Sequence, residues 1–182
     1  MGGIVQVWDL ETTSDIVKFQ GHQSQITAIN SSLGNEFVVT GSKDCKVKLW
    51  DQRVSTNVAT FRNNKGTINA LQLSPDARWV ATGSEDGSLR IWDVTADKEL
   101  SNFYFAGQSL TCLLFNPQLL TMANGSSDRT VKYWDLETLE SISQSAPDAS
   151  TITHLTFSGE CPDHLFACSS ENIRLWNIET NQ

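Results

Sequence analysis

Hydrophobic and polar residues alternate over short stretches of this chain, and turn residues separate the stretches. In one representative segment the alternation predicts strands at 26–31 (ITAINS), 37–42 (FVVTGS), 47–51 (VKLWD) and 57–61 (NVATF). The connections between them, such as 32–36 (SLGNE) and 43–46 (KDCK), are short and polar. Short strands without helical periodicity predict an all-β fold.

The same pattern recurs with a fixed period. Five tryptophans stand 42 residues apart, at Trp8, Trp50, Trp92, Trp134 and Trp176. Each lies in a similar string, and the strings are VQVWD, VKLWD, LRIWD, VKYWD and IRLWN. A period of this length marks a stack of identical supersecondary units. Four strands in roughly 40 residues describe one blade of a β-propeller.

Composition narrows the class of protein without changing the predicted fold. The chain has 182 residues, of which 39% are hydrophobic and 19% charged, as is typical of a globular protein. No stretch approaches the ~18 apolar residues that a membrane-spanning helix requires, and we find no secretory signal. The four cysteines form no CxxC pair, so we expect packed, reduced thiols in an intracellular protein.

The net charge of −8 is distributed unevenly along the chain. Residues 1–65 contain seven Lys or Arg against six Asp or Glu, whereas residues 66–182 contain six against fifteen. A surface that follows nucleic-acid phosphates needs a basic face. The acidic larger part of the chain therefore disfavours nucleic acid as a partner.

Basic residues stand two positions before four of the five tryptophans. These positions hold Gln6, Lys48, Arg90, Lys132 and Arg174. We interpret the methylene stems as covering the indole rings while the charges reach solvent or an acidic turn. The alternative is a contact with a phosphate or a partner.

The repeated strings resemble the WD-repeat family, in which a His, a Ser or Thr, an Asp and a Trp form a hydrogen-bonded ladder within a blade. One repeat contains the full set, which is His22, Thr40, Asp44 and Trp50. The later sets are Asn64, Thr82, Asp86 and Trp92; Ala106, Asn124, Asp128 and Trp134; and Asp148, Phe166, Ser170 and Trp176. The resemblance implies that the ladder is structural and is not a catalytic triad.

Three longer strings resemble the propeller of the katanin regulatory-subunit family. They are KVKLWDQR at 46–53, LSPDARWVATGSEDGSLRIWD at 73–93 and GSSDRTVKYWDLE at 125–137. In that family the propeller targets and tunes a microtubule-severing complex, while a helical C-terminal domain, which has no counterpart in this sequence, holds an AAA ATPase subunit. The resemblance implies a non-catalytic scaffold, cytoplasmic and cytoskeleton-associated, with tubulin and a katanin-type AAA ATPase complex as partners.

Two other functions remain open at this point. A WD-repeat adaptor of another pathway is the main alternative, as a ubiquitin-ligase substrate receptor or a chromatin or transcription scaffold. An enzyme of the propeller class is the third, but the sequence offers no convergent set of acid, base and metal ligands. His22, His154 and His164 have no metal-ligand spacing, and residues 83–87 (GSEDG) lack the lysine of a phosphate loop. We therefore expect no metal and no cofactor.

The resemblance also implies a ring that usually closes at seven blades. Residues 1–182 hold four full periods and 14 further residues, so we expect a propeller fragment of about four blades that forms an open arc. Closure as a four-bladed ring would require the strand at 15–19 (DIVKF) to complete the last blade. An open arc leaves an unpaired sheet edge at each end.

Partner-binding residues are expected on the narrower face of the propeller. The resemblance places the turns between second and third strands there, together with the connections that enter the first strands. Propellers commonly bind peptides at that face, so the candidates are Lys43, Lys46, Arg129 and His154. Lys43 and Lys46 suit an acidic surface such as a tubulin tail. The alternatives are an ordinary solvated turn and, for His154, a packed side chain at a position held elsewhere by Ala, Ala and Cys.

Overall fold

A computed structural model describes residues 2–11, 15–32, 34, 36–159, 161 and 163–178. Every regular element in these residues is a β-strand, and none of them forms a helix that could cross a membrane. The strands are β1 (Ile4–Trp8), β2 (Asp15–Gln20), β3 (Ile26–Ser31), β4 (Phe37–Ser42), β5 (Val47–Asp51), β6 (Thr56–Phe61), β7 (Ile68–Leu73), β8 (Trp79–Ser84), β9 (Ser88–Asp93), β10 (Lys98–Tyr104), β11 (Leu110–Phe115), β12 (Thr121–Ser126), β13 (Val131–Asp135), β14 (Ser141–Gln144), β15 (Ile152–Phe157), β16 (His164–Ser169) and β17 (Ile173–Asn177).

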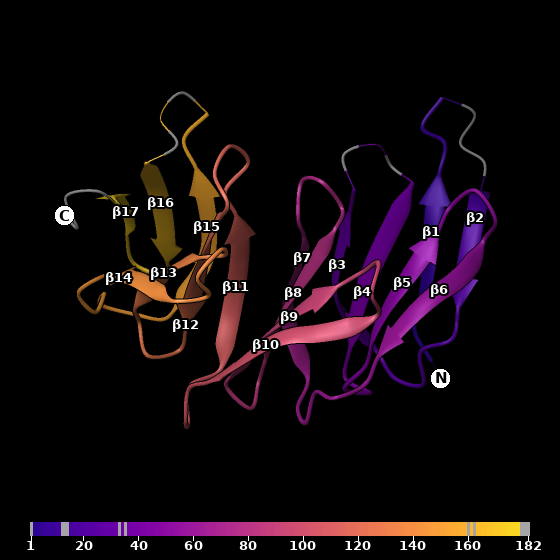
Figure 1. Ribbon diagram of the computed structural model, residues 1–182, viewed down its shortest axis with the longest axis horizontal. Coiled ribbons are helices and arrows are strands. Elements are labelled where there is room, and N and C mark those ends of the chain that lie inside the picture. Colours follow the sequence, from indigo (N-terminus) through magenta and orange to yellow (C-terminus); the bar gives the residue numbers. More distant parts are fainter. Residues whose placement is uncertain are drawn as a thin grey trace.

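The strands form antiparallel sheets that follow the sequence period, and we call these sheets blades 1 to 5. Blade 1 is β1-β2, blades 2 to 4 are β3-β4-β5-β6, β7-β8-β9-β10 and β11-β12-β13-β14, and blade 5 is β15-β16-β17. Figure 1 shows the blades following one another from the indigo N-terminal end to the yellow C-terminal end. The predicted all-β fold, a partial WD-type propeller, is confirmed.

The arc is open at its ends. β2 pairs with β1, with Ile4 opposite Gln20, and within the described residues the only sheet neighbour of β17 is β16. The strand at 15–20 therefore does not complete blade 5, and a four-bladed ring closed through it does not form.

The first strand of each of blades 2 to 5 lies nearest the propeller axis. These inner strands, β3, β7, β11 and β15, contact one another in turn. The chain enters them at one end of the blades and leaves them at the other. We call these ends the entry face, with residues 43–46 and their equivalents, and the exit face, with residues 74–78 and theirs. The amide of Lys43 donates to the carbonyl of Gln25 at 3.0 Å, so the turn at 43–46 adjoins the connection into β3.

The core lies between the blades. Each internal tryptophan packs against a phenylalanine from the outer strand of the preceding blade. The ring-centroid distances are 5.2 Å for Phe19 and Trp50, 4.9 Å for Phe61 and Trp92, and 4.6 Å for Phe103 and Trp134. Such aromatic pairs add to the free energy gained from burying their area. The 42-residue spacing of both rings therefore repeats one interface between successive blades.

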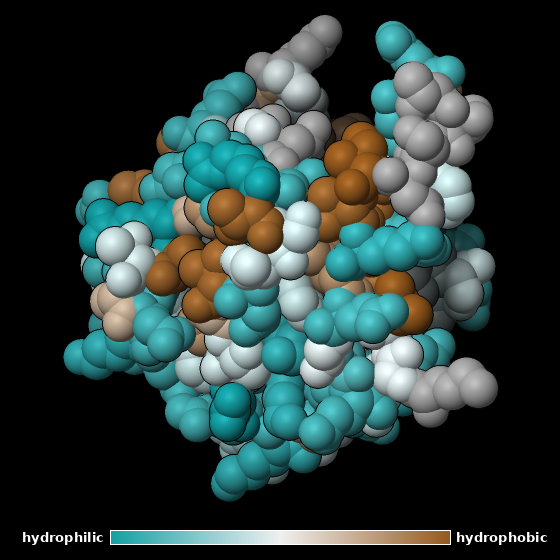
Figure 2. Space-filling model, turned by 90° about the vertical axis from the view of Figure 1, so that its right-hand side faces the viewer, coloured by the Kyte–Doolittle hydropathy of each residue, from teal (hydrophilic) through white to brown (hydrophobic). Residues whose placement is uncertain are grey.

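The N-terminal end exposes large apolar residues, and one of them, Trp8, has equivalents that are buried inside the arc. Figure 2 shows the N-terminal end, where brown hydrophobic side chains gather across blades 1 and 2. The exposed large hydrophobic residues of this end include Ile4, Trp8, Ile16 and Ile29. Trp8 is 53% exposed, whereas Trp50 is 3% exposed, because no preceding blade covers Trp8 in the described structure.

Candidate functional site

The ladder of blade 2 is complete. The indole N–H of Trp50 donates to Thr40 Oγ1 at 2.9 Å, and Thr40 Oγ1 lies 2.8 Å from His22 Nε2. His22 Nδ1 lies 3.0 Å from Asp44 Oδ2. A consistent network has Nδ1 donating to the carboxylate and Nε2 accepting from the Thr40 hydroxyl, which assigns the neutral tautomer. Each buried polar group thereby gains a partner.

The carboxylate of Asp44 also closes the entry-face turn. Its oxygens accept from the amides of Gln23 at 2.9 Å and Lys46 at 3.0 Å. Burial alone would raise the pKa of Asp44, but the hydrogen bonds from Gln23, His22 and Lys46 outweigh it, so its pKa lies below the usual 3.8. The ladder therefore holds a charged carboxylate whose hydrogen bonds fix the local backbone.

The ladder of blade 3 is interrupted at one residue. The indole N–H of Trp92 donates to Thr82 Oγ1 at 3.1 Å, as in blade 2. Asp86 instead accepts from the amide and hydroxyl of Ser88, at 2.9 and 2.7 Å. Asn64 occupies the place of His22, and both polar atoms of its buried side chain have no partner in the described structure. Its shorter side chain leaves the ladder without its middle member.

The ladders of blades 4 and 5 contain fewer hydrogen bonds than the ladder of blade 2. In blade 4 the indole N–H of Trp134 donates to Asn124 Oδ1 at 2.7 Å, and Asp128 accepts from the amide of Thr130 at 3.0 Å. In blade 5 Phe166 provides no hydroxyl. The indole N–H of Trp176 accordingly has no partner in the described residues. In blade 4 the carboxylate of Asp128 thus closes its entry-face turn, as Asp44 does in blade 2.

The basic residues before the tryptophans contact groups within the arc. Lys48 Nζ lies 5.5 Å from the ring centroid of Trp50, and Lys132 Nζ lies 4.1 Å from that of Phe105. Arg90 pairs with Glu99 at 2.6 Å, and Arg174 with Asp148 at 3.3 Å. Each of the four basic side chains therefore has a partner within the arc, and none of them requires an external phosphate.

The four candidate partner-binding residues lie on separate elements. Lys43 and Lys46 share the β4–β5 turn, Arg129 lies on the β12–β13 turn, and His154 lies on the inner strand β15. Arg129 has a left-handed backbone with a φ of 70°, and so do its equivalents Cys45 and Gly87, at 61° and 83°. In the described part of the chain no hydrogen bond or ion pair joins the four side chains. Their role in partner binding stays a prediction.

His154 faces a groove along the inner strands. The groove has a volume of about 490 Å³ and is lined by β3, β7, β11 and β15. The side chain of His154 is exposed, so it is available to a ligand in the groove. Burial raises the pKa of neighbouring Cys112 to about 11, which keeps that thiol protonated.

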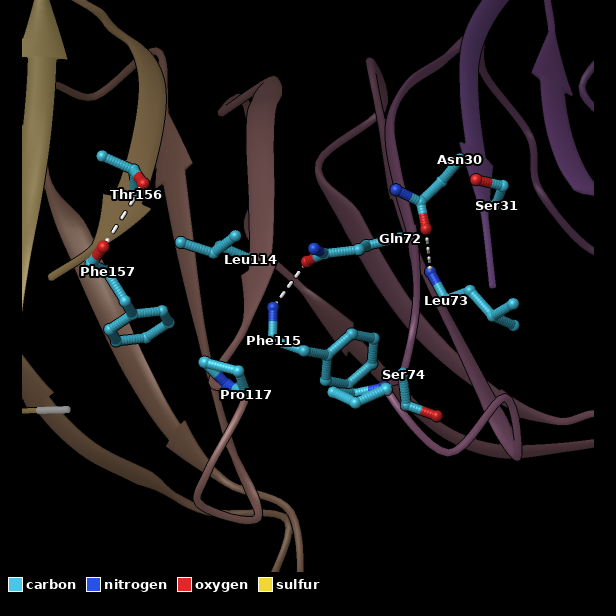
Figure 3. A pocket seen from close by; sticks show the side chains of 11 residues that line it. Asn30, Ser31, Gln72, Leu73, Ser74, Leu114, Phe115, Pro117, Thr156 and Phe157 are labelled. Atoms are coloured by element: carbon cyan, nitrogen blue, oxygen red, sulfur yellow. Dashed lines mark hydrogen bonds between the residues drawn. The ribbon is translucent and has the colours of Figure 1, made fainter. Parts of the chain in front are cut away.

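A second cavity lies at the exit face, and sequence reasoning missed it. We call it the exit-face cavity; it measures about 350 Å³ and sits between the ends of the four inner strands (Figure 3). Its apolar side chains are Leu73, Pro75, Leu114, Phe115, Pro117 and Phe157, and its polar ones are Asn30, Ser31, Gln72, Ser74 and Thr156. Within the described residues, no ionisable side chain lines it.

A periodic signal in the sequence could have indicated this cavity. Residues 30, 72, 114 and 156 are separated by 42 positions and hold Asn, Gln, Leu and Thr. These positions are half-buried in Asn30, Gln72 and Leu114 and exposed in Thr156, and the first two carry carboxamides. The described residues contain no group of three or more His, Cys, Asp or Glu that could hold a metal ion.

Comparison with protein families agrees with this geometry. The model of the family "WD domain, G-beta repeat" matches residues 13–51, 55–93 and 98–135, together more than half of the chain. The last repeat lies outside the matched residues, and it is the one whose indole N–H, on Trp176, has no partner in the described residues. No curated protein matches the chain significantly. The matched repeats, the blades and the complete ladder of blade 2 show that the chain belongs to the WD-repeat family.

Proposed function

We propose that this chain is a targeting and regulatory propeller of a katanin-like microtubule-severing complex. WD repeats mediate protein–protein interactions and are generally non-catalytic, which makes the chain a protein-interaction scaffold. The katanin-like role is carried by the resemblance of three strings, at 46–53, 73–93 and 125–137. The proposed partners are tubulin and a katanin-type AAA ATPase complex, and the proposed location is the cytoplasm, at the cytoskeleton.

The entry face offers a contact suited to tubulin. Lys43 is exposed on the β4–β5 turn, and Lys46 lies half-buried at its end. The tails of tubulin are acidic, so two lysines on one projecting turn favour their capture by long-range attraction. The acidic balance of residues 66–182 leaves this N-terminal turn as the favoured contact.

Co-sedimentation of the full chain with microtubules tests the role. We expect the chain to pellet with intact microtubules, and to pellet severalfold less when protease treatment has removed the acidic tails or when salt is raised. The double variant Lys43→Glu/Lys46→Glu should bind intact microtubules as weakly as the wild type binds microtubules without tails. Lys98→Glu, an exposed lysine at the exit face, is the matched control and should bind normally.

Two results would contradict the microtubule role. One is equal pelleting of the chain with intact and tail-free microtubules, and the other is unchanged pelleting of the double lysine variant. Affinity capture from lysate followed by mass spectrometry supplies the second test. An AAA ATPase and tubulin among the captured proteins support the katanin-like role, whereas ubiquitin-ligase or chromatin subunits favour an adaptor of another pathway.

A further inference from the structure

The exit-face cavity contains two carboxamides whose orientation is fixed. The amide N–H of Leu73 donates to Asn30 Oδ1 at 3.0 Å, and the amide N–H of Phe115 donates to Gln72 Oε1. A backbone N–H can only donate, so each side-chain oxygen must face it. The –NH₂ groups of Asn30 and Gln72 are thereby turned away from these amides, as Figure 3 shows for their nitrogens.

A third donor comes from the backbone of β15. The amides of Ser74, Asn116 and Ser158 donate to the second strands of their blades. Because successive amides of a strand point to opposite sides, the preceding amides, of Leu73, Phe115 and Phe157, point toward the axis. Leu114 stands where Asn30 and Gln72 accept in the earlier blades, and it has no acceptor for the N–H of Phe157.

The walls of the cavity define what can fill it. Pro75 and Pro117 lie on the exit-face turns, and Phe115 and Phe157 come from neighbouring inner strands. A volume of about 350 Å³ lies at the low end of the range for ligand sites, and fits one large side chain with its adjoining peptide groups. With no ionisable group in the described lining and a net charge of −8, the site does not favour an anion.

We propose that the exit-face cavity binds an uncharged, extended peptide segment of a partner protein. Backbone carbonyl oxygens of the segment accept from the –NH₂ groups of Asn30 and Gln72 and from the N–H of Phe157. One apolar side chain of the segment packs between Pro75 and Pro117. This inference rests on the scaffold function but not on the microtubule role, because it uses a different face from Lys43 and Lys46.

The test follows the side-chain amide signals of Asn30 and Gln72 by NMR in the full chain. The probes are the capped peptides acetyl-SAFAS-amide, acetyl-SAAAS-amide and acetyl-DAFAD-amide. We expect the first to shift the signals of Asn30, Gln72 and the Phe157 amide in a saturable way. The second should bind more weakly because it lacks the apolar side chain, and the third because its carboxylates meet no cation.

Two variants sharpen the test. Gln72→Leu copies the residue that the chain carries at the equivalent position 114; it removes the –NH₂ donor of Gln72 but also frees the N–H of Phe115, so acetyl-SAFAS-amide should now shift the Phe115 amide as it shifts the Phe157 amide. Leu114→Gln should give the Phe157 amide an internal acceptor, so the peptide-induced shift of that amide should shrink. Dispersed NMR spectra show that a variant is folded. If Gln72→Leu does not fold, the shifts measured in Leu114→Gln and in the wild type still test the proposal.

Specific outcomes would overturn the proposal. They are no saturable shift with acetyl-SAFAS-amide, shifts confined to the entry face, or a Phe115 amide that the peptide leaves unshifted in the folded Gln72→Leu variant. The Lys43→Glu/Lys46→Glu variant should bind this peptide normally. Failure of microtubule binding with retained peptide binding would reject only the katanin-like role, and the reverse result would reject only the cavity.

Discussion

At the scale of single residues, the ladder depends on side-chain length as much as on residue type. In blade 2 the imidazole of His22 spans the gap between Thr40 and Asp44. Asn64 has suitable donors and acceptors, but it reaches neither neighbour. A buried polar group without a partner costs about 1–3 kcal/mol of folding free energy. Blade 3 therefore contains a site that a longer side chain can repair.

Asn64→His should stabilise the chain. The imidazole would bridge Thr82 and Asp86 as His22 bridges Thr40 and Asp44, and we expect the free energy of unfolding to rise by about 1–2 kcal/mol. Urea unfolding followed by tryptophan fluorescence measures the change. Lys65→His, at an exposed neighbour, controls for the new histidine and should leave stability unchanged. An equal or lower stability of Asn64→His would show that blade 3 cannot form the ladder.

Asp44→Asn should destabilise the chain in a pH-dependent way. At neutral pH we expect the free energy of unfolding to fall by about 1–3 kcal/mol, because an asparagine side chain has one accepting oxygen where the carboxylate has two. The folded-state pKa of Asp44 lies below 3.8, so the contribution of its carboxylate is complete above the unfolded pKa and is lost as pH falls through the folded pKa. The urea-unfolding curves of the two proteins should therefore converge as the pH falls through the folded-state pKa of Asp44.

A matched change at an unpaired position completes that experiment. Asp97→Asn alters an exposed turn residue and should lower stability little at any pH. A constant difference between Asp44→Asn and the wild type from neutral to acid pH would mean that packing, and not the charged carboxylate, explains the effect.

Residue chemistry could be predicted from the sequence only where the family pattern is intact. The set His22, Thr40, Asp44 and Trp50 follows from the resemblance to the WD-repeat family. The sequence alone could not predict that Asn124 would accept from Trp134 while Asn64 stays unpaired. Asn124 stands at the position of Thr40, beside the indole, whereas Asn64 stands at the position of His22, where its shorter side chain reaches no partner.

At the scale of elements, one glycine in each of blades 2 to 4 sets how closely the next blade approaches. Gly41, Gly83 and Gly125 are spaced by 42 residues on the second strands. A Cβ at Gly83 would lie 2.9 Å from Leu110 Cβ, closer than real Cβ contacts. A Cβ at Gly125 would lie 2.7 Å from Ile152 Cγ2. Each glycine lets an inner strand of the next blade rest against the backbone.

Gly83→Ala should therefore weaken the contact between blades 3 and 4. We expect a loss of about 1–3 kcal/mol in the free energy of unfolding, as for overpacked cores. Gly159→Ala is the control, because a Cβ there meets no atom within 4 Å. Thermal unfolding of both variants gives the comparison. Equal stability of the two variants would show that blades 3 and 4 can make room for the added methyl group without a loss of stability.

Strands could be predicted closely, but the space between them could not. The expected strands at 26–31, 37–42 and 47–51 are β3, β4 and β5, and the fourth begins one residue earlier, at Thr56. Alternation and turn residues determine such local boundaries. The exit-face cavity depends on four inner strands that are distant in sequence. Only the curvature of the arc brings Asn30 and Phe157 to one cavity.

At the scale of the whole molecule, the blade interface is repeated inside the arc and left open at its end. Val47, Leu89 and Val131 are at most 2% exposed because the following blade covers them. Their equivalent in blade 5, Ile173, is 73% exposed, and Leu175 is 52% exposed. An apolar face on β17, the edge strand of blade 5 in the described residues, favours contact with other molecules.

The double variant Ile173→Lys/Leu175→Lys should accordingly reduce self-association of the chain. Lysine on an edge strand opposes pairing through charge and hydration, and these exposed positions make few contacts within the chain. Sedimentation equilibrium should give a wild-type mass that rises with concentration, and a variant mass that stays near the 20.2 kDa of one chain. Val58→Lys adds charge at a similarly exposed residue on the outer strand of blade 2, and should still associate. A wild type that stays monomeric throughout would show that the polar surroundings of β17 suffice to keep this face in water.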